Sequence, residues 1–364
     1  MIGKTLSIYI SIRFLKILAG MVAGLVFLIV TVDFIEQLRK ASDVEDVTLW
    51  QLYSISLMRA PVFVEKAFPF GCLFAAMITL TQLNLKMELV VARSAGVSAW
   101  QFLLPIGISS IFVGVFVAMV YNPLAILAFQ KSQDLSAAVL EKKFGTKNKD
   151  TESHYWIKQQ DERGVTTYIN AAFARDNGKL LTRAKFLKLD ETGGLEERID
   201  ALRASYRGDH WLLEEARINR GGVTMSKNLI KLETKLTEND LLGVSAKPDG
   251  VSFWELQEVS KRLEKSGTNG NPYLVQYHSL TALPMFLLAM ILVAATVCLR
   301  FVRFGQVGRM ILGGIMFGFV LYIITSLITA LGSNGVVPPV VAAWAPGFVA
   351  ILFGISALLH QEDG

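Results

Sequence analysis

The chain has 364 residues, of which 52% are hydrophobic and only 18% charged, and its mean hydropathy is +0.43. Residues 131–265 carry 24 of the 36 Lys and Arg residues and 22 of the 31 Asp and Glu residues. This distribution excludes a single soluble globule and also a bundle made only of membrane helices. It predicts a membrane protein with one inserted, water-facing domain.

Three apolar segments precede the charged region, at residues 14–32, 67–85 and 101–130. Each approaches or exceeds the length of about 20 residues that a helix needs to cross a bilayer. The second and third contain no charged residue, and the stem of Lys16 can reach the interface from the first. The first segment is not followed by a signal-cleavage pattern, and we expect it to be retained.

Three further spans follow the charged region, because Asp, Glu, Lys and Arg are absent from residues 266–299 and 310–361. We expect helices at 280–299, 310–331 and 340–359, with a Gly- and Pro-rich turn at 332–339 between the last two. The predicted organisation is therefore residues 1–130 with three spans, an inserted domain at 131–270, and residues 271–364 with three spans.

The short loops predict the orientation of the chain. Eight Lys and Arg residues lie on the side of the N-terminus and four on the other side. Because cytoplasmic loops carry the excess of positive charge, both termini are expected in the cytoplasm. The inserted domain is then expected outside the cytoplasmic membrane.

The inserted domain shows the alternation of apolar and polar residues that is typical of β-strands, with turn residues at short intervals. Examples lie at 154–158, 165–170, 180–189 and 211–218, and residues 206–211 resemble a tight hairpin. The apolar spacing of Phe253–Leu263 is helical. We therefore predict an all-β domain without disulfides, because Cys72 and Cys298 both fall inside predicted membrane helices.

Motifs for catalysis are absent from the sequence. It has no phosphate-binding P-loop and no G-x-S-x-G nucleophile, and its four His residues are scattered. We therefore expect a non-enzyme that binds no cofactor and takes its energy from a partner.

The loop between the second and third spans, about residues 86–96, is the first candidate functional segment. Met87, Val90 and Val91 share one face of a short amphipathic helix, with Glu88 and Arg93 largely elsewhere. Such a helix can insert into a groove of a motor subunit. It can equally lie on the lipid surface, and the pattern leaves both open.

Four cations near the opposite membrane surface form the second candidate site. Arg39 and Lys40 end the first helix, and Arg59 and Lys66 lie at the start of the second. Charge-assisted hydrogen bonds from these side chains could hold lipid phosphates. Alternatively, Arg39 and Lys40 form an ordinary solvated helix end, and the cations near Glu65 pair with it.

Several segments resemble the LptF/LptG family of lipopolysaccharide-export permeases, and the likeness extends over the whole chain. They are Phe34-Ile-Glu-Gln-Leu-Arg-Lys-Ala41, Ala67-Phe-Pro-Phe70, Glu88-Leu-Val-Val-Ala-Arg-Ser-Ala-Gly-Val-Ser98 and Met316-Phe-Gly-Phe-Val-Leu-Tyr322. The segments 37–40 and 88–91 are more similar to the LptG branch of the family.

The resemblance implies a bacterial inner-membrane subunit of an ABC transporter. Its partners would be the sister permease LptF, two copies of the ATPase LptB, LptC and a periplasmic bridge. Lipopolysaccharide would enter between the two permeases, past gates that include the first and fifth spans, and pass into a periplasmic β-jellyroll.

The same resemblance assigns roles to individual residues. Glu88, Leu89 and Arg93 would belong to the helix that docks into LptB. Arg39 and Lys40 match a basic pair that faces the lipid phosphates. Arg59 and Lys66 would line a polar vestibule together with this pair. Asp33 departs from the pattern, because some relatives are expected to have a basic residue there.

Other functions remain compatible with the residues. One is another ABC lipid or lipoprotein-export permease, although such proteins typically place the outer domain after the first span. The others are a membrane enzyme that modifies lipids, which needs convergent acid–base or metal groups, and a non-catalytic scaffold.

Overall fold

A computed structural model describes residues 4–41, 47–94, 96–144, 155–160, 166–175, 178–190, 194–220, 223–234, 236, 248–265, 269–299 and 307–363. The chain divides into two compact units. The membrane unit comprises Met1–Gly145, Ser252–Trp254 and Leu274–Gly364, and the β unit comprises Thr146–Val251 and Glu255–Tyr273. The predicted boundaries at 130/131 and 270/271 stay predictions.

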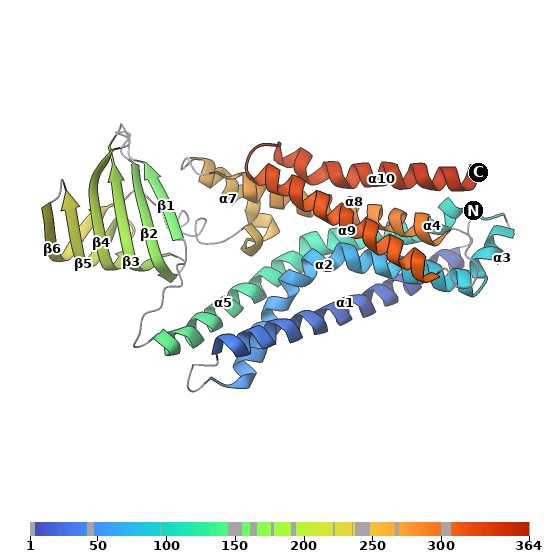
Figure 1. Ribbon diagram of the computed structural model, residues 1–364, viewed down its shortest axis with the longest axis horizontal. Helices are drawn as coiled ribbons and strands as arrows, with labels where there is room; N and C mark the ends of the chain where they lie inside the picture. Colours follow the sequence, from blue (N-terminus) through green and yellow to red (C-terminus); the bar gives the residue numbers. More distant parts are fainter. Residues whose placement is uncertain are drawn as a thin grey trace. The chain divides into compact units, whose positions relative to one another are not determined.

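The membrane unit is helical (Figure 1). Its elements are α1 (Lys4–Ala41), α2 (Leu49–Leu85), α3 (Glu88–Ser94), α4 (Ala99–Phe116), the π-helical turn η1 (Val117–Tyr121), α5 (Asn122–Phe144), α8 (Asn271–Cys298), α9 (Val307–Ser333) and α10 (Pro339–Asp363).

Within the part of the chain that the structure describes, six segments are long and apolar enough to cross a membrane, and they confirm the six predicted spans. They are Lys4–Arg39, Leu49–Leu85, Ala99–Gln133, Asn271–Cys298, Ile311–Ser333 and Pro339–Gln361.

The spans differ in how much of their surface the unit covers. In α2 and α8, 67% of the most apolar 18-residue stretch is buried, whereas the value is 11% in α1 and 17% in α9. The core therefore forms around α2 and α8. The apolar outer faces of α1 and α9 are suited to lipid or to a second membrane protein.

Two backbone features shape the third span. A Cβ on Gly114 would lie 2.5 Å from the Cα of Pro284, so α4 and α8 approach closely only because this residue is glycine. Pro123 has no N–H and its ring clashes with the carbonyl four residues earlier. The π-helical turn η1 lies just before Pro123.

The β unit contains a six-stranded antiparallel sheet, which confirms the predicted inserted β-domain. The strands pair in chain order and are β1 (Tyr155–Gln160), β2 (Thr166–Arg175), β3 (Leu180–Leu189), β4 (Leu195–Tyr206), β5 (His210–Arg220) and β6 (Val223–Glu233). The predicted hairpin joins β4 to β5 with Gly208 at φ +96°. A short η2 (Pro248–Gly250) and the predicted helix α7 (Phe253–Lys265) follow.

A row of interrupted pairing crosses the sheet from β2 to β6. The paired register skips Ala172, Arg183, Leu202, Glu215 and Asn228, and Arg183 and Glu215 have φ of 53° and 50°. The register on either side of the row is the same, because one residue is skipped on each strand of every pair, and the one shift in register among the described strands lies between Lys188 and Leu189. In β3, β4 and β5 a buried side chain lies on each side of the row, and these pairs are Leu181 and Ala184, Ala201 and Ala204, and Leu213 and Ala216.

The sheet curls until its two edge strands meet at one end. A flat sheet of six strands would separate β1 from β6 by about 24 Å. Instead, the Thr234 hydroxyl just after β6 donates to Gln159 Oε1 in β1 at 2.6 Å. The buried face therefore forms the inside of a curved trough, in keeping with the predicted jellyroll-like shape, although the described strands follow one another as a meander.

Candidate functional site

The predicted coupling segment contains the short helix α3. Left-handed residues stand at both of its ends, Met87 at φ 59° and Gly96 at φ 85°. Met87, Val90 and Val91 are exposed, whereas Leu89 is buried in the helical core. Leu89 therefore anchors α3, and the exposed apolar side chains are the ones available to a partner.

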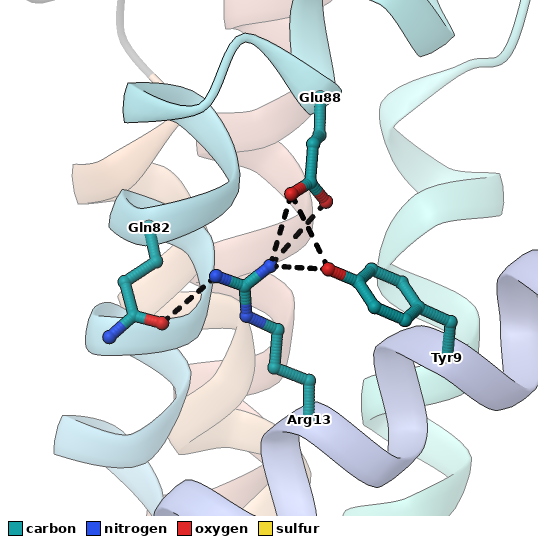
Figure 2. A network of polar contacts seen from close by, with 4 residues as sticks. All are labelled: Tyr9, Arg13, Gln82 and Glu88. Atoms are coloured by element: carbon teal, nitrogen blue, oxygen red, sulfur yellow. Dashed lines mark hydrogen bonds and ion pairs between the residues drawn. The ribbon is translucent and has the colours of Figure 1, made fainter.

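Glu88 is held by two side chains from α1, and one of them, Arg13, is also bonded to α2 (Figure 2). Arg13 Nη1 donates to Glu88 Oε1 at 3.3 Å and to Oε2 at 3.4 Å, and the Tyr9 hydroxyl donates to Oε1 at 3.4 Å. Arg13 Nη1 also donates to the Tyr9 hydroxyl at 2.7 Å, and its Nη2 donates to Gln82 Oε1 at 3.1 Å. The network joins three helices at one end of the membrane unit.

The predicted vestibule contains an ion pair that the sequence did not specify. Arg59 Nη1 lies 3.5 Å from Asp33 Oδ1, and the two side chains are 25% and 11% exposed. Gln37 donates to the other carboxylate oxygen at 3.5 Å. Asp33, the departure from the family pattern, therefore pairs with Arg59 and joins α1 to α2.

The remaining predicted site residues are placed as follows. Arg39 and Lys66 are exposed, while the side chains of Lys40 and Arg93 lie outside the described part of the structure. Glu65 is buried and bonded to a neutral partner, described next. The structure thus brings Arg59 together with an acid and leaves the role of the four cations in lipid binding a prediction.

A buried polar cluster lies where the chain returns to the membrane unit. The Asn122 amide donates to both Glu65 carboxylate oxygens at 3.1 and 2.9 Å, and its Oδ1 accepts the Phe253 backbone N–H at 2.9 Å. Phe253 stacks on Tyr277 with ring centroids 5.3 Å apart. One asparagine therefore connects α2, the start of α5 and the first residue of α7.

Replacing Asn122 should destabilise the membrane unit. In Asn122→Asp, a second carboxylate would face Glu65 in place of two N–H donors, which we expect to cost about 1–3 kcal/mol. The apparent melting temperature of the purified protein should fall. Adding Glu65→Gln restores a donor opposite the new carboxylate and should recover most of the loss, whereas an unchanged melting temperature in the single variant would contradict this role.

The trough of the β unit holds a cavity of about 560 Å³. Its floor is apolar and includes Ile169, Phe186, Ile199 and Trp211, and its rim is polar. Trp211 is fully buried, and its Nε1 lacks a hydrogen-bond partner among the described residues. A cavity with an apolar floor and a polar rim suits a ligand that is itself amphipathic.

The rim of this cavity includes Asp209 from the β4–β5 hairpin. A hydrogen bond from the His210 ring lowers the pKa of the Asp209 carboxyl. In the part of the chain that the structure describes, no group of three or more His, Cys, Asp or Glu residues could hold a metal ion.

Comparison with known proteins identifies the family. Residues 8–360 match the family model described as lipopolysaccharide export system permease LptF/LptG. The chain belongs to this family. Its six spans and inserted β-domain follow the organisation that the sequence resemblance implied, and membership gives it a permease role in lipopolysaccharide transport.

Individual relatives in the LptF/LptG family are distant but similar over their full length. The chain is 23% identical to the lipopolysaccharide export system permease protein LptG of Escherichia coli (strain K12), over 99% of this chain and 97% of that protein. It is 24% identical to LptG of Haemophilus influenzae (strain ATCC 51907 / DSM 11121 / KW20 / Rd), over 99% of both chains.

Proposed function

We propose that this chain is the LptG-type, non-catalytic subunit of an ATP-driven exporter in the bacterial inner membrane. It extracts lipopolysaccharide from the membrane and passes it through the β-domain toward the outer membrane. The sister permease LptF, two copies of the ATPase LptB, LptC and a periplasmic bridge complete the assembly. ATP is bound and hydrolysed by the ATPase, and both termini lie in the cytoplasm with the β-domain in the periplasm.

The observation that carries this proposal is the apolar trough of the β unit. A lipid with several acyl chains and a large saccharide needs a surface that shields the chains while the sugars stay in water. The cavity floor of Phe186 and Trp211, below a polar rim, supplies such a surface. Its chemistry favours a lipid over a water-soluble substrate.

The apolar outer faces of α1 and α9 support the same function. Six spans from one chain enclose too little volume for a lipid with several acyl chains, and a second permease would complete the wall. Exposed apolar faces on α1 and α9 are the surfaces that such a partner would cover.

A photo-crosslinking experiment tests the path through the β-domain. Benzoylphenylalanine replacing Phe186, on the cavity floor, should crosslink to lipopolysaccharide in an ATP-dependent manner in the reconstituted complex. The matched control is Lys185, the preceding residue, whose side chain is exposed on the opposite face.

The two positions give distinct outcomes. Crosslinks at Phe186 that exceed those at Lys185 by about tenfold are expected, because only one of the two faces lines the trough. Equal crosslinking at both positions would contradict passage along the inner face. Crosslinks to a lipoprotein in place of lipopolysaccharide would favour the alternative of a lipoprotein-export permease.

A further inference from the structure

The backbone leaves the helical conformation on both sides of α3. Met87 adopts a left-handed conformation, which is unfavourable for a non-glycine residue, and Gly96 adopts a left-handed conformation at the other end. The seven-residue helix α3 is therefore not a continuation of α2 or α4. Its orientation depends on the side chains that hold it.

Arg13 is the residue that holds α3 to α1. Its side chain is 14% exposed and is fixed by Tyr9 from its own helix and by Gln82 from α2. The guanidinium thus has a defined position before it meets Glu88, and its planar fork favours such multiple contacts. The ion pair with Glu88 joins two residues that are 75 positions apart in the sequence.

The Glu88 carboxylate can accept a further hydrogen bond from a second partner. Its side chain is 33% exposed, and its contacts with Arg13 measure 3.3 and 3.4 Å, longer than the 2.7–2.9 Å typical of a tight charge-assisted bond. A carboxylate offers about four acceptor positions. Glu88 can therefore accept a hydrogen bond from a cytoplasmic protein while Arg13 still holds it.

Helix α1 also forms an ion pair with α2 near its other end. Asp33 lies 20 residues after Arg13, which is about 30 Å along a helix, and it pairs with Arg59 of α2. One ion pair thus joins α1 to α3 near one end of the span, and another joins α1 to α2 near the other end. A continuous helix of 38 residues connects the two.

We propose that Arg13 is a positioning residue for transport: it joins α3 to α1, so that displacement of α3 by the ATPase moves α1 and reaches the Asp33–Arg59 pair. The inference rests on the proposed function in one respect, that a cytoplasmic ATPase binds at α3. It goes beyond that function by naming α1 as the element that receives the motion and Arg13 as the side chain that transmits it.

The test measures lipopolysaccharide released per ATP hydrolysed by the whole complex in proteoliposomes. Arg13→Gln should retain the ATPase at normal stoichiometry and hydrolyse ATP, but release at least about fivefold less lipid per ATP, the scale of a typical coupling between sites. Arg13→Lys, which keeps the charge but not the fork, should recover part of the ratio. Lys16→Gln removes an exposed cation from the same helix and should leave the ratio unchanged.

Each contrary result overturns the inference. These results are an unchanged ratio in Arg13→Gln, an equal loss in Lys16→Gln, and a loss of ATPase from the Arg13→Gln complex, which would make Arg13 a docking residue. If Arg13→Gln does not assemble, Tyr9→Phe combined with Gln82→Met removes the groups that fix Arg13 while keeping the ion pair, and an unchanged ratio there also overturns it. Failure of the premise that an ATPase docks at α3 is distinguishable, because it appears as normal ATPase stoichiometry in Glu88→Lys, and failure of the proposed function appears as equal crosslinking of lipopolysaccharide at Phe186 and Lys185.

Discussion

The variant Glu88→Lys is expected to purify with at least about tenfold less ATPase than the unaltered chain, because loss of one partner of a charge pair that is buried at an interface costs about 2–5 kcal/mol, and the proposed docking would bury Glu88. The new ammonium would also face Arg13, whose side chain is largely buried, and the repulsion would turn α3 away from α1. Quantitative mass spectrometry of the detergent-purified complex measures the ratio of ATPase to permease.

Two controls separate docking from folding in this experiment. Glu88→Gln keeps an acceptor for Arg13 and removes only the charge, so we expect an intermediate loss of ATPase. Lys86→Glu reverses the charge of an exposed neighbour just before α3 and is the control for a change of charge near α3 that leaves Glu88 in place. Unaltered stoichiometry and ATPase activity in Glu88→Lys, with the protein intact in the membrane, would exclude Glu88 from the motor interface.

The membrane spans could be predicted from the sequence because the bilayer imposes a length and an apolar composition on each one. The predicted span 340–359 lies within Pro339–Gln361, and the predicted turn at 332–339 separates α9 from α10. These features depend on local composition. Tertiary contacts do not alter them.

The β-domain was predictable as a class but not in every strand. Alternation is visible in β3, where Leu181, Ala184 and Phe186 are buried and the left-handed residue Arg183 lies between the first two. It is hidden in β4, where Leu195, Ile199 and Leu202 have helical spacing among strong helix formers. The pairing of β4 between β3 and β5 overrides this local preference.

The polar contacts of the candidate site could not be predicted. The sequence distinguishes Arg13 only as one of the eight cations on the side of the N-terminus, yet it binds Glu88 from 75 positions away. Asn122 carries no signal in the sequence, because its role depends on Glu65 and the Phe253 backbone meeting at one point. Such pairings arise from the helix packing, which single-sequence patterns do not encode.

The pairing of Asp33 with Arg59 changes the expected charge of the vestibule. Because the acid offsets one of the four predicted cations, Arg59 is less available to a lipid phosphate than the sequence alone indicates. The pair also links the start of α2 to α1. The Asp33–Arg59 pair therefore acts first on the packing of α1 against α2.

Arg59→Glu should accordingly have a large effect on stability. It would place two carboxylates where an ion pair now measures 3.5 Å, with the side chains only 25% and 11% exposed. Removing one partner of a buried pair costs 3–5 kcal/mol, and for this partly exposed pair we expect about 2 kcal/mol. The apparent melting temperature and the yield of folded protein should both fall.

The reversed pair distinguishes a specific contact from a general need for positive charge. Adding Asp33→Arg to Arg59→Glu restores an attractive pair between the same helices and should recover most of the melting temperature, whereas Lys66→Glu alone should change it little because that side chain is exposed. If the double variant is as unstable as Arg59→Glu, the Asp33–Arg59 contact does not hold α1 against α2. Recovery of stability without recovery of lipopolysaccharide crosslinking near α1 would show that the position of the cation also matters to the lipid.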